Sequence, residues 1–232
     1  MEPEITKQVF LRVVAEEGPK LFSQAGFSKT GPATFWRRLD GVEHGIFLRP
    51  EPGFTCFTFS VGATAPPIDR RTDYIDFGGK HYPTLLVSRR LGEFRQNSAY
   101  ADSNYCFTDA KQLRALFPKV YTDFVEQAEP WLEQLKTIDG VAREFYKRRI
   151  GPPSSGEDRP PDPFAWAIYG WLLQECGHHD VARSWLEKAY EFVKQPVRKQ
   201  EGRVFPRVPG VGPIPYTAED KRLIELLEKD LQ

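Results

Sequence analysis

Two pairs of adjacent arginines, Arg37-Arg38 and Arg89-Arg90, are the side chains best suited to chemistry in this 232-residue chain. Each pair lies in a strand-like stretch, where successive side chains point to opposite faces of a sheet. The planar guanidinium fork suits a carboxylate or a phosphate. If the strands are close together, arginines and neighbouring rings could form a site for a small anionic or phosphorylated ligand: Trp36, Arg37, Arg38, His81, Arg89, Arg90, Tyr100 and Tyr105.

A simpler interpretation is that the arginines pair within the protein or lie exposed at the edges of a sheet. The candidate carboxylate partners are Asp40, Glu43, Asp102 and Asp109. We favour this interpretation over a ligand site. The single histidines His44 and His81 are likewise interpreted as structural rather than catalytic.

Motifs for metal binding and for catalysis are weak. His178-His179 stands beside Cys176 and Asp180, but these groups fall in one tight turn, whereas a zinc site needs four converging ligands. No serine occupies a nucleophile elbow, and Gly78-Gly79-Lys80 is too short for a phosphate-binding loop. The sequence therefore predicts no metal and no cofactor, and it favours a protein that is not an enzyme.

Composition narrows the class of protein further. The 32 Lys and Arg residues balance 32 Asp and Glu residues, which disfavours a nucleic-acid partner. No apolar run is long enough to span a membrane, and the first residues lack the apolar core of a signal peptide. Cys56 and Cys106 are interpreted as buried apolar residues, and with Cys176 they indicate a reduced, cytoplasmic compartment.

The elements that would position the arginines begin with Gly26, a predicted helix C-cap after an amphipathic helix over about residues 4–25. Gly18-Pro19 predicts a kink or two helices within that stretch. Asp40-Gly41 predicts a hairpin turn. Alternation of apolar residues predicts five strands at about 33–40, 44–49, 54–63, 82–91 and 104–108, with one face packed on helices and the other partly open. Helices are predicted at about 110–116, 118–129, 130–136 and 139–149.

A family resemblance supports this arrangement. The pattern Gly26-Phe27-x-Lys29-x-Gly31-x-x-Thr34-Phe35-x-Arg37, the later Arg90-Leu91-Gly92, the pair Tyr105 and Phe107, and Pro130-Trp131-Leu132 resemble an uncharacterised bacterial family of α+β domains (domain of unknown function 4304 type) over about residues 4–136. The second strand departs from the family, because Gly45-Ile46-Phe47 stands where members carry Asn or Gln. The resemblance implies a helix-covered antiparallel sheet and no known reaction.

The rest of the chain reads as a linker and a helical appendage. Residues 151–162 are rich in Pro, Gly and Ser, so we predict an α+β sheet domain over 1–150 and a helical appendage over 163–232. Small residues at Ala167, Gly170, Ala182 and Ala189 resemble one tetratricopeptide-type helical hairpin. A single such unit cannot bury its own face. A final helix is predicted after Thr217.

These observations predict an α+β protein with an antiparallel sheet of about five strands. The function that fits best is a non-enzymatic protein-interaction module, an immunity or accessory protein among the possibilities, which binds an unknown protein through the open sheet face or the helical hairpin. The alternative is an enzyme or a binding protein for a small anionic or phosphorylated ligand in the sheet cleft. The sequence does not indicate an oligomeric state.

Overall fold

The computed structural model describes residues 6–68, 85–94, 105–152, 162–194 and 218–232. Its contacts group the chain into two compact units. Unit 1 comprises residues 1–65 and 85–137, and unit 2 comprises residues 66–84 and 138–232. Whether the chain divides into independent domains at residue 150 stays a prediction.

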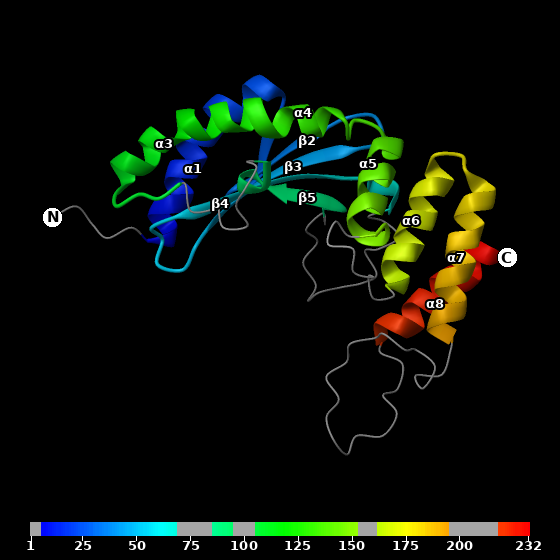
Figure 1. Ribbon diagram of the computed structural model, residues 1–232. Coiled ribbons are helices and arrows are strands. Elements are labelled where there is room, and N and C mark those ends of the chain that lie inside the picture. The colour runs from blue at the N-terminus through cyan, green and yellow to red at the C-terminus, as the bar shows by residue number, and fades with distance from the viewer. Residues whose placement is uncertain (1–5, 69–84, 95–104, 153–161, 195–217) are drawn as a thin grey trace, which may run out of the picture. The chain divides into compact units, whose positions relative to one another are not determined.

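Unit 1 contains a five-stranded antiparallel sheet in which each strand pairs with the next one along the chain (Figure 1). The strands are β1 (Ser28–Gly31), β2 (Thr34–Arg38), β3 (Glu43–Pro50), β4 (Phe57–Thr64) and β5 (Val87–Arg90). The predicted α+β class and the strand number are therefore confirmed. The membership of the sheet differs from the prediction at both edges: β1 was not predicted, and residues 105–107 form only an isolated bridge.

The predicted turns are present. Gly41 has a φ of 74°, and the amide of Leu39 donates to the carbonyl of Val42 at 2.9 Å, which closes the turn between β2 and β3. Gly26 has a φ of 79° and ends the first helical segment. Both positions need the left-handed backbone that glycine adopts at little cost.

The helices of unit 1 cover one face of the sheet, with α1 and α3 on the same side (Figure 1). They are α1 (Lys7–Phe22), a 3-10 turn (Ser23–Ala25), a second 3-10 turn (Leu91–Phe94), α3 (Ala110–Asp123), a π-helical turn (Phe124–Ala128) and α4 (Glu129–Glu133). Of the two alternatives predicted at Gly18-Pro19, two separate helices is wrong, because α1 is one continuous helix with Pro19 inside it, and a kink there stays a prediction. Pro118 lies inside α3 rather than at its start.

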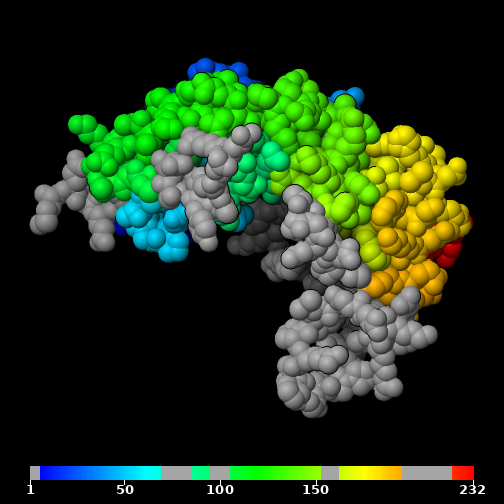
Figure 2. All heavy atoms as spheres, in the orientation of Figure 1, coloured from blue at the N-terminus to red at the C-terminus, as the bar shows by residue number. Residues whose placement is uncertain are grey.

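Phenylalanines fill the space between the helices and the sheet. Phe35, Phe57 and Phe59 point from the strands toward the helices and are almost fully buried, as alternation predicts. Phe22 of α1 contacts Phe35, with ring centroids 5.1 Å apart. Gly18 allows this approach, because a Cβ there would lie 2.4 Å from the ring of Phe35. In Figure 2 the side chains of α3 and α4, coloured green, form a continuous surface over this core.

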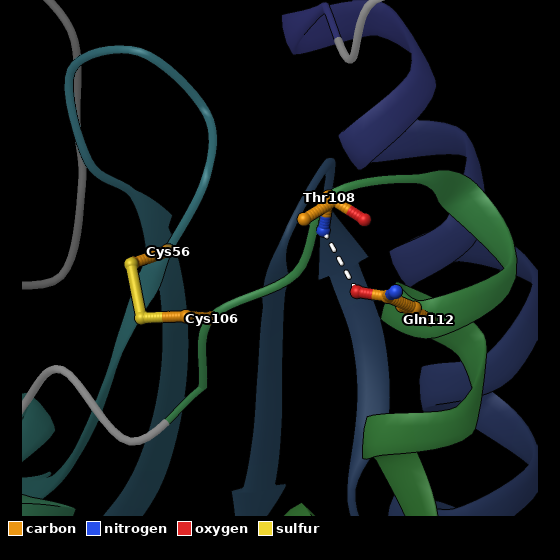
Figure 3. Close-up of a disulfide and its surroundings, with 4 residues drawn as sticks. All are labelled: Cys56, Cys106, Thr108 and Gln112. Atoms are coloured by element: carbon orange, nitrogen blue, oxygen red, sulfur yellow. Dashed lines mark hydrogen bonds between the residues drawn. A yellow bond between two sulfur atoms is a disulfide. The ribbon is translucent and has the colours of Figure 1, made fainter. Parts of the chain in front are cut away.

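The structure corrects the interpretation of Cys56 and Cys106 as buried apolar residues, because the two side chains form a disulfide (Figure 3). Their Cα atoms are 4.1 Å apart at an isolated antiparallel bridge. The flanking amides of Phe57 and Phe107 donate to Tyr105 and Thr55, so the cysteines face each other at a non-hydrogen-bonded position, where strands approach most closely. Cys106 is exposed and Cys56 partly exposed, so oxidation joins two surface positions.

The described secondary-structure elements of unit 2 are all helical. It contains α5 (Ile138–Phe145), a π-helical turn (Tyr146–Ile150), α6 (Pro163–Glu175), α7 (His179–Lys194) and α8 (Ala218–Leu231). The predicted hairpin is α6 and α7, and the predicted final helix is α8, which contacts α7 (Figure 1). Gly170 permits close packing of the hairpin, because a Cβ there would lie 2.8 Å from Leu186. Among the described helices of both units, none is long and apolar enough to cross a membrane.

Candidate functional site

Arg37 is the central residue of the predicted anion site, and the structure turns it toward the helices. Its Nη1 donates to Glu129 Oε1 at 2.6 Å and to the carbonyl of Ala25 at 3.0 Å. Its Nη2 donates to His44 Nδ1 at 3.0 Å, and the guanidinium lies 4.7 Å from the centroid of Phe27. Arg37 therefore joins β2 to α4 and to the end of the first helical segment.

His44 completes this network as a neutral ring. Arginine can only donate, so Nδ1 accepts, and Nε2 carries the proton that it donates to the carbonyl of Leu135 at 3.1 Å. His44 is fully buried. Burial lowers the pKa of His44 to about 4. The positive charge of Arg37 also lowers this pKa, whereas the hydrogen bond to the carbonyl of Leu135 raises it. Both ring nitrogens are engaged and the ring is neutral near pH 7, which suits a structural role.

Trp36 and Arg38 lie on the opposite face of the sheet from Arg37. The side chain of Arg38 is 85% exposed and pairs with Glu43 at 3.0 Å. Trp36 is buried and meets Phe47 edge to face, with centroids 5.6 Å apart. Arg37 and Arg38 therefore each form an ion pair with a carboxylate of the protein. The partner of Arg38, Glu43, was an expected one, whereas the partner of Arg37, Glu129, was not.

The second arginine pair is remote from the first. Arg89 pairs in register with Val61 on the helix-covered face, and its guanidinium lies 5.1 Å from the ring of Phe94. Arg90 is exposed and points to the other face. Three strand spacings and two residues along the strands separate Arg37 from Arg89, so their backbones are about 16 Å apart. The guanidinium of Arg37 is held by Glu129 and that of Arg89 lies against Phe94, so the two groups do not converge on one site.

Tyr105 is buried and points to α3, where its hydroxyl donates to Asp123 Oδ2 at 2.6 Å. Lys119 contacts the same oxygen at 2.6 Å. Predicted site residues His81 and Tyr100 lie outside the described residues. Of the predicted site residues that the structure describes, Arg37 contacts His44, which was not part of the predicted site. The structure does not bring the two arginine pairs together.

Metal and nucleophile chemistry gain no support in the described parts of the chain. No group of three or more His, Cys, Asp or Glu side chains there could hold a metal ion. His178 and His179 are exposed at the turn between α6 and α7. Burial raises the pKa of the Cys176 thiol, and the negative charge of Asp139 adds to the effect, so the reactive thiolate is disfavoured.

A surface that the sequence analysis did not single out lies on the α6–α7 hairpin and the turn after α5. We call it the aromatic face, and it consists of Tyr146, Trp166, Tyr169, Trp185 and Phe192. Tyr146 is 38% exposed, and the other rings are partly exposed. Val181 of α7, 54% exposed, lies one helical turn from Trp185. Figure 2 shows α6 (yellow) and α7 (orange) side by side.

The rings of the aromatic face form two contacting groups. Tyr169 contacts Tyr146 and Trp185, with centroids 5.2 and 5.4 Å away. Trp166 meets Phe192 at 5.4 Å. Burial raises the pKa of the Tyr169 hydroxyl, with a contribution from Tyr146, so this phenol is neutral. The face is therefore a set of uncharged rings, packed against one another and still open to solvent.

Lys188 joins the two groups of rings. Its ammonium lies 4.3 Å from the centroid of Trp166 and 4.5 Å from that of Trp185, a cation–π arrangement with two indoles. The sequence signal for the face was present: Val181, Trp185, Lys188 and Phe192 recur with helical spacing beside the buried stripe Ala182, Leu186, Ala189 and Val193.

Comparison of the chain with family models, with curated proteins and with solved structures finds no match in any of the three. The resemblance to the uncharacterised bacterial family stays a prediction.

Proposed function

We propose that this chain is a non-enzymatic protein-interaction module whose partner binds the aromatic face. Tryptophan and tyrosine dominate the binding energy of protein interfaces, because each buries a large area at little cost in side-chain entropy. A contiguous cluster of partly exposed rings is unusual on a protein surface without a binding role. The proposal depends on this single observation.

The alternative, an enzyme or a binding protein for a small anionic ligand in the sheet, has less support. It needs arginines that are available to a ligand, whereas Arg37 holds Glu129 and Arg38 holds Glu43. The bacterial origin and the role as an immunity or accessory protein are proposals that depend on the family resemblance and on the interaction role.

A cytoplasmic location also stays a proposal, and the disulfide makes it testable. Cytosolic thiols are kept reduced, so Cys56 and Cys106 would be free thiols there. Trapping thiols with a mass-tagged alkylating reagent in intact cells distinguishes the compartments. Two tagged positions in addition to Cys176 support the cytoplasm, and protection of Cys56 and Cys106 supports an oxidising compartment.

Photo-cross-linking tests the interaction role at the aromatic face. We expect a benzoylphenylalanine introduced at Val181 to capture one protein from native lysate, because this exposed side chain lies beside Trp185. The matched control is the same substitution at Val125, which is 42% exposed in unit 1. Equal capture from both positions, or capture from neither, contradicts the proposal.

Replacing Trp185 supplies the affinity measurement. Trp185→Ala is expected to weaken partner binding about 30-fold, the loss that corresponds to a hot-spot tryptophan of about 2 kcal/mol. Val125→Ala should leave binding unchanged. Circular dichroism of both variants checks that the helices persist, so that a loss of binding is assigned to the missing ring.

A further inference from the structure

The aromatic face carries a more specific inference, which rests on the proposed function. We infer that its occupant is an extended, proline-containing peptide segment that carries a carboxylate. The inference follows from three properties of the face: the orientation of the rings, the spacing of the two tryptophans and the charge between them.

Three of the four ring contacts of the aromatic face are nearly perpendicular, and the fourth, between Tyr146 and Tyr169, is tilted at 42°. The interplanar angles are 79° for Tyr169 and Trp185, 76° for Tyr146 and Trp185, and 81° for Trp166 and Phe192. Edge-to-face neighbours produce a ridged surface rather than a flat one. Aromatic ridges of this kind receive the pyrrolidine rings of a polyproline II segment, whose shape is already set before it binds.

The two tryptophans have a spacing that suits such a segment. Because the Lys188 ammonium lies 4.3 Å from one indole centroid and 4.5 Å from the other, the rings are no further apart than one three-residue turn of a polyproline II helix, about 9 Å. Two prolines separated by two residues can therefore contact Trp166 and Trp185 in turn. An amphipathic helix would need a row of aliphatic contacts, and Val181 is the exposed aliphatic residue of this stripe.

The charge between the tryptophans selects the sign of the partner. Lys188 is exposed and makes no ion pair with a carboxylate of the described residues. Lys147, the residue after Tyr146, is also exposed and makes no ion pair with a described carboxylate. The neighbouring Glu187 forms an ion pair with Arg183, with Nε and Oε1 2.9 Å apart. Glu191, exposed on the adjoining flank of α7, is the opposing charge. An ammonium already held in place by two rings can accept a carboxylate with little further loss of side-chain freedom.

Indole signals in a 15N-correlated NMR spectrum of the full chain report this binding. The protein has five tryptophans. Trp166 and Trp185 are expected to shift when a peptide of about nine residues with repeated Pro-Pro-Glu, three polyproline II turns, is added. Trp36, Trp131 and Trp171 are buried and serve as internal controls that should not move.

Matched peptides and variants separate the contributions of shape and charge. Replacing Glu by Gln in the peptide, or Lys188→Gln in the protein, should weaken binding about tenfold, the effect of one charge-assisted contact. A Gly-Gly-Glu peptide should bind far more weakly, because it lacks the rings and the set backbone. Lys229→Gln, an exposed lysine on α8, is the control and should change nothing.

The outcomes distinguish this inference from the proposed function. Shifts with a helical amphipathic peptide and none with the proline peptides overturn the inference, while capture at Val181 would still support the interaction module. Shifts of Trp166 and Trp185 with single-stranded oligonucleotides, and none with peptides, overturn both. Equal affinity for the Glu and Gln peptides overturns the assignment of a carboxylate.

Discussion

At the scale of single residues, the contact between His44 and Arg37 links the stability of unit 1 to pH. Burial lowers the pKa of His44 from 6.5 to about 4. The unfolded chain therefore binds a proton at this ring at pH 5, whereas the folded chain does not. Stability that is present at pH 7 is lost as the pH falls from 6.5 through 4, and below pH 4 the ring is protonated in both states.

The expected size of this effect is about 3 kcal/mol between pH 7 and pH 4, from the cost of about 1.4 kcal/mol for each pKa unit. Urea denaturation across this range measures it. His44→Gln should be less stable at pH 7 and should have a flatter pH profile, because the titrating ring is gone. His179→Gln, at an exposed position, should keep the wild-type slope. Parallel profiles for His44→Gln and the wild type would contradict the assignment.

At the scale of elements, α8 is held to the hairpin by polar contacts at its C-terminal end. Trp171 of α6 donates its indole N–H to Asp230 Oδ2 at 2.7 Å. Glu228 accepts from the Tyr190 hydroxyl at 3.0 Å and pairs with Lys194 at 3.1 Å. Leu223 and Leu227 are buried on the same helix. The final helix is thus a structural part of unit 2, since it completes the apolar surface that α6 and α7 share.

Asp230→Ala is expected to lower the free energy of unfolding by about 1–3 kcal/mol, because the buried indole of Trp171 loses this acceptor. Asp230→Asn, which keeps an oxygen at this position, should cost less. Thermal unfolding measures the change, and the indole signal of Trp171 should move in the folded variant. Glu225→Ala, exposed on the same helix, is the control. An unchanged Trp171 signal in Asp230→Ala would contradict the contact.

At the scale of the whole molecule, the disulfide joins two cysteines of unit 1 that are far apart in the sequence. Cys56 and Cys106 are separated by 50 residues. A cross-link over a loop of this length stabilises the folded state by up to about 4 kcal/mol, because it restricts the unfolded chain. The bond also fastens the residues before α3 to β4, where Phe57 stacks on Tyr105 with centroids 5.2 Å apart.

Reduction of the disulfide, or the double variant Cys56→Ser/Cys106→Ser, is therefore expected to lower the free energy of unfolding by about 2–4 kcal/mol. Urea denaturation with and without a phosphine reductant measures the loss. The reductant should have no effect on the double variant, and Cys176→Ser should retain the full difference. A wild-type midpoint that is insensitive to reductant would show that the bond contributes nothing to stability.

Local patterns predicted much of the architecture and little of the long-range pairing. Asp40-Gly41 and the alternation of Phe57 and Phe59 suffice for the meander, because turn chemistry and side-chain direction are local properties. The partner of Arg37 is 92 residues away in sequence, which no local pattern reveals. The short strand β1 escaped prediction because its exposed residues Ser28–Thr30 lack apolar alternation. The aromatic stripe on α7 has a local helical period, so its residues are readable from the sequence, unlike the partner of Arg37.

Among the strands that the structure describes, β1 and β5 lie at the two ends of the sheet order and are the shortest, with four residues each. A long, flat outer strand would offer unpaired amides and carbonyls to a second molecule and would favour aggregation. Here the outer strand β1 is brief and carries the exposed charge of Lys29. We therefore expect the outer strand β1 to be a poor template for recruiting strands from other chains.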